Sequence, residues 1–205
     1  MTERQGRARM HWERHRSDCP WCRTDRPCAF GEGLRTTAEH APLPLPASAA
    51  LRYTASLVVR TFIPRHAPEG TKPAPVETVL AEVRIGGRVP LPPRLDLIPH
   101  SPTGFGWGYG GSGPAQLALA LLAHAFGSDE VALRYYQRFK EDVVTPLPGE
   151  TGWFLEVGTV WRWALERRLA LAVAHIPPDF REQVRRDPAM RRRWPWAGRE
   201  WEKAP

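Results

Sequence analysis

A block rich in glycine and aromatic residues stands directly before an apolar stretch, and it limits what this chain can fold into more than any other feature. The block and stretch read HSPTGFGWGYGGSGPAQLALALL from His100 to Leu122. Glycine permits positive φ and close approach of two backbones. Pro114 at a first helical position, followed by regularly placed leucines, indicates the start of a helix. We therefore expect a loop of defined shape that leads into a helix.

Three aromatic residues alternate within the block: Phe105, Trp107 and Tyr109. In an extended chain all three side chains would lie on one side. That side would be either a lid over the core or a surface that stacks on a partner or a nucleic acid. We favour the core, because aromatic side chains bury large areas and dominate packing.

Two known motifs resemble parts of the block, but neither is supported. Gly106, Gly108 and Gly111 fit G-x-G-x-x-G, but a dinucleotide site needs a strand before the loop and another after the helix. Ser112 does not fit a nucleophile elbow, because Pro114 stands where glycine is required. No paired carboxylates or nucleophile–base pattern occurs elsewhere, so neither an enzyme nor a small-molecule substrate is expected.

The start of the helix offers an anion-binding function. Backbone N–H groups at a helix N-terminus carry partial positive charge and can hold a phosphate or a carboxylate. The candidate anion-binding residues are Ser112, Gly113, Ala115 and Gln116. Ser112 is also expected to cap the helix.

Three cysteines cluster near the N-terminus in the spacing C-x2-C-x5-C. Three thiolates and one imidazole form a tetrahedral zinc site, and such a site would order a segment that has little core of its own. The predicted zinc ligands are His15, Cys19, Cys22 and Cys28, with His11 or His40 as substitutes for His15. Three reduced cysteines without metal are the plain alternative.

The same cysteines, in CPWCRTDRPC, resemble the cysteine core of the WhiB-like iron–sulfur regulators. That resemblance implies an iron–sulfur cluster as the alternative cofactor. The family supplies a fourth cysteine upstream, which this chain lacks. Because clusters are usually ligated by four cysteines, we prefer zinc.

Positive charge gathers at the two ends of the chain. The 205 residues hold 29 lysines and arginines against 22 acidic residues, and only three of the 29 are lysine. A GC-rich genome would also produce that arginine bias. Basic ends rich in tryptophan suit phosphate contact and base stacking. The residues predicted to contact nucleic acid or a protein partner are Arg191, Arg192, Arg193, Trp194 and Trp196, with Phe105, Trp107 and Tyr109.

Hydrophobic patterning predicts the α+β class, with a small antiparallel sheet packed by about three helices. Strands are expected at Tyr53–Ile63, at Val79–Leu91 with a turn at Gly86–Gly87, and at Trp153–Val157. Helices are expected at 114–126, Asp129–Val144 and Thr159–Ala174, with a short helix after Pro177. The predicted parts are a Cys/His zinc-knuckle-like module (1–35), a Pro/Ala-rich linker (36–50), the central domain (51–175) and a basic Trp-rich tail (176–205).

The N-terminal sequence lacks the apolar region of a secretory signal, and no run reaches the roughly 20 apolar residues that a membrane span needs. We therefore expect a cytoplasmic protein without a membrane partner.

The glycine block, the downstream YYQRFKEDVV and Trp153 together resemble an uncharacterised family of small domains from bacteria, phages and plasmids. The similarity spans Tyr53 to Leu165. It implies a domain of unknown function and a mobile-element origin, without an activity. Members often have glutamate where this chain has Gly106.

Three functions follow from these observations. The first is a non-enzymatic, zinc-containing accessory protein that contacts nucleic acid through its basic termini. The second is a protein–protein interaction module with Trp and Arg hot spots. The third is an enzyme or anion-binding domain that uses the glycine-rich loop.

Overall fold

The computed structural model describes residues 3–19, 35, 46–62 and 76–188. The helices are α1 (Glu3–Asp18), α3 (Ser112–Phe126), α4 (Asp129–Phe139), α5 (Val157–Glu166), α6 (Ala170–Ala174) and α7 (Pro178–Arg186), with a π-helical turn η2 (Lys140–Val144) after α4. The strands are β1 (Arg52–Phe62), β2 (Val76–Ile85), β3 (Val89–Pro90) and β4 (Trp153–Glu156).

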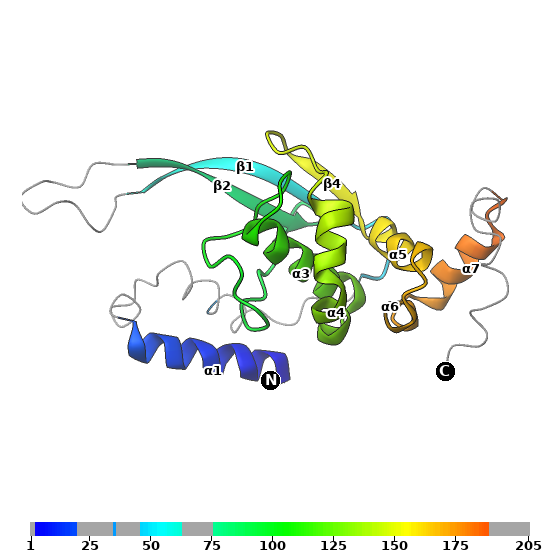
Figure 1. Cartoon of the computed structure of the whole chain (residues 1–205), viewed down its shortest axis with the longest axis horizontal. Coiled ribbons are helices and arrows are strands. Elements are labelled where there is room, and N and C mark those ends of the chain that lie inside the picture. Colours follow the sequence, from blue (N-terminus) through cyan, green and yellow to red (C-terminus); the bar gives the residue numbers. More distant parts are fainter. Residues whose placement is uncertain (1–2, 20–34, 36–45, 63–75, 189–205) are drawn as a thin grey trace, which may run out of the picture.

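The four strands form one antiparallel sheet in the order β3-β2-β1-β4. The predicted hairpin is confirmed, and its turn contains Gly86 (φ 58°) and Gly87 (φ 70°). Tight hairpin turns need positive φ at such positions, which glycine adopts without strain. Strand β4 pairs with the first four residues of β1, up to Ala55 opposite Trp153. The rest of the β1–β2 hairpin extends away from the helices (Figure 1).

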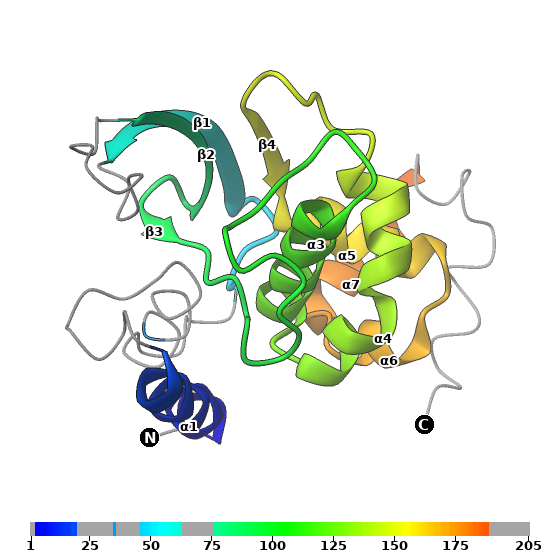
Figure 2. The ribbon, with the colours of Figure 1, turned by 60° about the vertical axis from the view of Figure 1, so that its left-hand side comes forward.

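One face of the sheet is apolar and the other is polar, as the period of two in a strand requires. The inward residues are buried: Tyr53, Ala55, Val83, Ile85, Trp153 and Leu155. The outward residues include Arg52, Thr54, Arg84 and Phe154. Helices cover the inward face only (Figures 1 and 2). The α+β class is therefore confirmed.

Helix α3 is the centre of the core. Every residue from Gly113 to Phe126 is buried, so the helix is covered on all sides, as a helix that is apolar all round requires. It packs against α4 and α5, and the Trp161 indole N–H donates to the Ala125 carbonyl at 2.8 Å. The helix ends at Gly127 in the left-handed conformation (φ 61°), the usual way for glycine to stop a helix.

Helix α4 begins at Asp129, as predicted, and the hydroxyl of the preceding Ser128 caps it by accepting a hydrogen bond from the Val131 N–H at 3.3 Å. The predicted single helix Asp129–Val144 is only partly regular. Its last turn widens into η2, where the Thr145 N–H donates to the Lys140 carbonyl at 2.8 Å. This i to i+5 hydrogen bond defines a π-helical turn.

The predicted helix Thr159–Ala174 is wrong in extent, because the chain breaks it into α5 and α6. Arg168 lies between them at φ 52°, a conformation that ends a right-handed helix. The apolar residues with helical spacing in this range are nevertheless buried on both sides of the break: Trp161, Leu165, Leu169 and Ala172.

The short C-terminal helix expected after Pro177 is α7, and it packs on the same core. Phe180 and Val184 belong to the core cluster, and the Phe180 ring meets Trp161 edge to face at 5.0 Å between centroids. In the described part of the chain, no helix has the length and apolarity needed to cross a membrane.

Candidate functional site

The loop before α3 is shaped by a contact between two backbones. Gly108 has φ 80°, and a Cβ atom placed on it would lie 2.4 Å from Gly149 Cα. The Gly108 N–H also donates to the Val144 carbonyl at 3.2 Å. Only glycine fits here, since a side chain would be strained in φ and would collide with backbone.

The turn at Gly108 separates the three aromatic side chains instead of placing them on one side. Trp107 is 3% exposed and meets Trp153 edge to face with centroids 5.7 Å apart. Phe105 is half-buried against the core. Tyr109 lies beyond the turn and is 52% exposed. Of the three predicted contact residues, Tyr109 is therefore the one presented to solvent.

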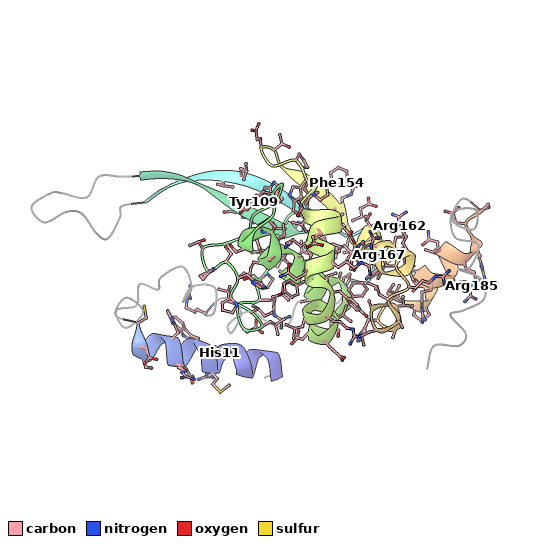
Figure 3. All side chains as sticks on the ribbon, viewed as in Figure 1. His11, Tyr109, Phe154, Arg162, Arg167 and Arg185 are labelled. Carbon is pink, nitrogen blue, oxygen red and sulfur yellow. The ribbon has the colours of Figure 1, made fainter. Side chains whose placement is uncertain are left out.

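Three glycines lie close to the ring of Tyr109, whose position Figure 3 shows. A Cβ on Gly106 would lie 2.5 Å from the Tyr109 hydroxyl, one on Gly113 2.8 Å from it, and one on Gly111 2.9 Å from the ring. These positions accept a large ring because they carry no side chain. The block is thus a loop that presents one aromatic residue, Tyr109, to solvent.

The predicted anion-binding residues at the start of α3 are not equally available. Ser112 is exposed, but Gly113, Ala115 and Gln116 are buried. The Ala115 N–H donates to the Gly111 carbonyl at 3.2 Å. Ser112 is the first helical residue rather than the cap, because the cap position is Gly111 and no side chain caps the helix.

The Gln116 amide faces inward. Its oxygen accepts from the Ser101 N–H at 3.1 Å, and its Nε2 donates to the Pro93 carbonyl. The side chain is 0% exposed. It fixes the chain that enters the glycine block, and because it is fully buried it cannot reach an anion in solvent.

A buried ion-pair cluster was not predicted from the sequence. Arg94 is 1% exposed and has φ 57°, and it contacts Asp96 at 2.9 Å and Asp129 at 2.7 Å. Burial alone would lower the pKa of Arg94, but the hydrogen bonds and negative charges of the two aspartates raise it above its ordinary value. The cluster joins the segment before the glycine block to the start of α4.

The signal for this cluster was an arginine and an aspartate two residues apart in the apolar stretch PLPPRLDLI. Charged residues are almost never fully buried unless they are paired. That spacing does not reveal the third member, Asp129, which is 35 residues further along.

Two further side-chain contacts hold the layers together. The Tyr53 hydroxyl and His124 Nδ1 are 2.7 Å apart in the core and join β1 to α3, and burial raises the pKa of Tyr53. The Asp142 carboxylate in η2 accepts from the Trp163 indole at 3.0 Å and from Arg167 at 2.7 Å. Burial would raise the pKa of Asp142, but these two donors, with the charges of Arg167 and Arg138, lower it.

Residues 69–166 match DUF6166, a family of unknown function. The resemblance to a family without a known activity is thereby confirmed. The DUF6166 match covers β2, β3, the glycine loop, α3, α4, β4 and α5. No curated protein and no solved structure matches the chain. The family description names no activity, ligand or partner, so function has to be argued from the residues.

Two of the four predicted zinc ligands lie in the described part of the chain, outside the DUF6166 match. His15 is on the last turn of α1, and the Cys19 N–H donates to the His15 carbonyl at 2.9 Å. This helical spacing of four residues places both side chains on one face, and both residues are half-buried. Cys22 and Cys28 lie outside the described residues. Among residues 3–19, 35, 46–62 and 76–188, no three potential ligands converge.

The predicted contact residues of the tail also lie outside the described residues: Arg191, Arg192, Arg193, Trp194 and Trp196. Immediately before them, α7 carries Arg181, Arg185 and Arg186. Glu182 contacts Arg185 at 3.1 Å and Arg186 at 2.8 Å. The basic character of the C-terminal segment therefore begins on a helix that is packed on the region that matches DUF6166.

Proposed function

We propose that this chain is a non-enzymatic accessory protein that contacts nucleic acid through its basic ends, with the DUF6166 domain as scaffold. The supporting observation is the separation of charge. Residues 1–35 carry eight basic and five acidic side chains, and residues 157–205 carry eleven basic and six acidic ones. The middle of the chain, residues 36–156, carries ten basic and eleven acidic side chains. The whole positive excess thus lies at the ends, where it can neutralise phosphates.

Helix α1 supports a polyanion contact because it is polar on all sides. Its exposed basic residues are Arg9, His11, Arg14 and Arg16, and Figure 3 labels His11. Arg9 pairs with Glu13 at 2.8 Å, but both side chains are more than 60% exposed. Such surface pairs contribute at most about 1 kcal/mol, so a phosphate can compete for the arginine.

Helix α7 supports the same function at the other end. Phe180 and Val184 hold it on the core, and its arginines are therefore attached to a rigid body. A fixed cationic surface loses less side-chain entropy on binding than a free one. The adjacent tail adds three consecutive arginines and three tryptophans, which suit phosphate contact and base stacking.

The test is a fluorescence anisotropy titration of the full chain with short labelled single- and double-stranded DNA and RNA. We expect substitution of Arg191, Arg192 and Arg193 by serine to weaken binding to every sequence alike. The slope of log K against log salt should fall by about one for each phosphate that the variant no longer neutralises. The matched control replaces three arginines of the scaffold by serine: Arg88, Arg134 and Arg138.

The control removes the same charge from exposed positions in the near-neutral region. An equal drop in affinity in both variants would show that only net charge matters and would contradict contact through the ends. Absence of binding by the unaltered chain at low salt would end the proposal.

We further propose that zinc orders the N-terminal module, with His15, Cys19, Cys22 and Cys28 as ligands. The half-buried His15 suits this role better than His11, which is exposed one turn earlier. Elemental analysis of protein purified without added metal should give one zinc per chain and a colourless solution. Cys19→Ser should lose the zinc, whereas Ser17→Ala on the same helix should keep it. Iron with a brown colour would contradict zinc and support a cluster.

A protein partner is the second candidate, and one exposed residue favours it. Phe154 is 63% exposed on the outward face of the sheet, and the Arg52 guanidinium lies 5.0 Å from its ring centroid. The tryptophans at 107, 153, 161 and 163 are buried and cannot serve as hot spots. Capture of a partner after nuclease treatment, abolished in Phe154→Ala but kept in Thr54→Ala, would support this candidate over nucleic acid.

A further inference from the structure

A cavity of about 240 Å³ lies between the start of α5 and one face of α7. Gly158 and Arg162 line it from α5, and Phe180, Gln183 and Val184 line it from α7. Residues four apart share a helix face, so each helix contributes one continuous wall. Figure 3 shows Arg162 on α5. The cavity is separate from the glycine loop and from the predicted zinc ligands.

Gly158 in the lining is hydrogen-bonded to the segment that precedes β1. The Gly158 N–H donates to the Ala49 carbonyl at 2.9 Å. A Cβ on Gly158 would lie 3.0 Å from Ala49 Cβ and 3.4 Å from Phe180 Cε2. A larger side chain at this position would therefore crowd Ala49 and Phe180, so glycine keeps this part of the lining open.

Arg162 is the cation among the residues that line the cavity. It makes no hydrogen bond or ion pair with another residue that the structure describes. Two carboxylates also line the cavity, those of Glu156 and Asp187. Glu156 accepts two hydrogen bonds from the Arg52 guanidinium, at 3.1 and 3.2 Å. Asp187 also has an interaction partner. The cavity therefore presents one uncommitted positive charge above an apolar wall of Phe180 and Val184.

We infer that this cavity binds a small organic acid. The planar guanidinium of Arg162 matches a carboxylate in two parallel hydrogen bonds. Phe180 and Val184 contact the apolar body, and the Gln183 amide lies on the same helix face to donate to the acid. Drug-sized ligands occupy pockets of roughly 300–1,000 Å³, so this cavity suits a smaller molecule. The inference is independent of nucleic-acid contact and of zinc.

The experiment is an NMR titration of the full ¹⁵N-labelled chain with phenylacetate, following the Gly158 amide and the Arg162 Nε–H signals. We expect both signals to shift, with a dissociation constant of about 0.1–1 mM for so small a ligand. Phenethylamine has the same ring with a positive charge, and it should not bind. Phenyl phosphate tests the other anionic head group and should bind more weakly.

Arg162→Gln should weaken phenylacetate binding at least about tenfold, the size of effect expected from losing a charge-assisted hydrogen bond. Arg134→Gln removes an exposed arginine from α4 and should leave binding unchanged. Ala50→Leu, at an exposed lining position, should block the cavity without affecting the fold. Near-UV circular dichroism checks the fold of each variant.

Four results would overturn the inference. These are no shift up to about 10 mM phenylacetate, equal binding by Arg162→Gln, equal binding of phenethylamine, and tighter binding of phenyl phosphate. The last would assign the cavity to phosphate monoesters instead of organic acids.

Discussion

Gly108→Ala should destabilise the domain strongly, because two separate costs meet at this position. The residue has φ 80°, and the new Cβ would lie 2.4 Å from Gly149 Cα. A left-handed conformation costs an L-residue about 1–2 kcal/mol. Forcing extra atoms into a packed site costs typically about 1–3 kcal/mol. We therefore expect the free energy of unfolding to fall by about 2–5 kcal/mol.

Two other glycines of the same loop separate these costs. Gly104 has φ 132° but no atom within 4 Å of an added Cβ, so Gly104→Ala should cost about 1–2 kcal/mol from backbone strain alone. Gly110 has open space around it and no positive φ. Gly110→Ala should change stability by no more than about 0.5–1 kcal/mol in either direction.

Urea unfolding followed by tryptophan fluorescence measures all three variants, since Trp107 and Trp153 are buried beside the loop. For a chain of this size the Gly108→Ala change corresponds to a melting temperature lower by about 4–20 °C. The order of stability should be Gly110→Ala, then Gly104→Ala, then Gly108→Ala. Coincident transitions for Gly108→Ala and Gly110→Ala would refute the account of the loop.

Three smaller changes test other interactions by the same unfolding assay. Ser128→Ala removes the cap of α4 and should lower the free energy of unfolding by about 1 kcal/mol. Ser112→Ala removes no cap and should leave stability nearly unchanged. Equal losses of stability in the two variants would contradict the cap assignment. Tyr53→Phe breaks the hydrogen bond to His124 and should cost about 1–3 kcal/mol. Because the pKa of Tyr53 is raised by burial, the unaltered protein should lose stability above about pH 10, and Tyr53→Phe should show less of this loss. Because the pKa of Asp142 is lowered, its contribution is full above about pH 5 and is lost as the pH falls through the lowered pKa. Asp142→Asn should therefore be less stable than the unaltered protein at neutral pH, and the difference should close in acid; a difference that stays constant with pH would contradict the ion pair.

Local signals in the sequence were sufficient to predict the turns and helix ends that depend on one or two residues. Gly86 and Gly87 marked the hairpin turn, and Gly127 and Ser128 marked the junction between α3 and α4. In each case the conformation that the turn or cap needs is one that the residue type favours. Such positions can be predicted without knowledge of the tertiary structure.

Periodicity alone failed where a helix breaks without losing its apolar stripe. Leu165 and Leu169 are both buried, although α5 has ended before the second of them. Arg168 supplies the break, and arginine is an ordinary helix residue, so nothing local announces it. The π-helical turn η2 is of the same kind, since Lys140 to Val144 read as a continuation of α4.

In the candidate sites, too, local spacing could be predicted from the sequence, whereas contacts between distant segments could not. The cysteine spacing predicted zinc ligands but not the helix α1 (Glu3–Asp18), which carries His15 on its last turn and is followed directly by Cys19. Arg162 carried no signal, because its cavity is formed by three segments that are far apart in the sequence. The cluster of Arg94, Asp96 and Asp129 likewise depends on a contact across 35 residues.

The salt dependence of nucleic-acid binding by the unaltered chain tests the central proposal most directly. Anisotropy titrations between about 50 and 200 mM salt should give log K that falls linearly with log salt, with a slope of several units, since each phosphate contact contributes about 0.7–0.9. Affinity should depend little on base sequence, because phosphate contacts carry no sequence information. No binding at the lowest salt, or affinity that does not change with salt, would contradict the proposal that the basic ends contact nucleic acid.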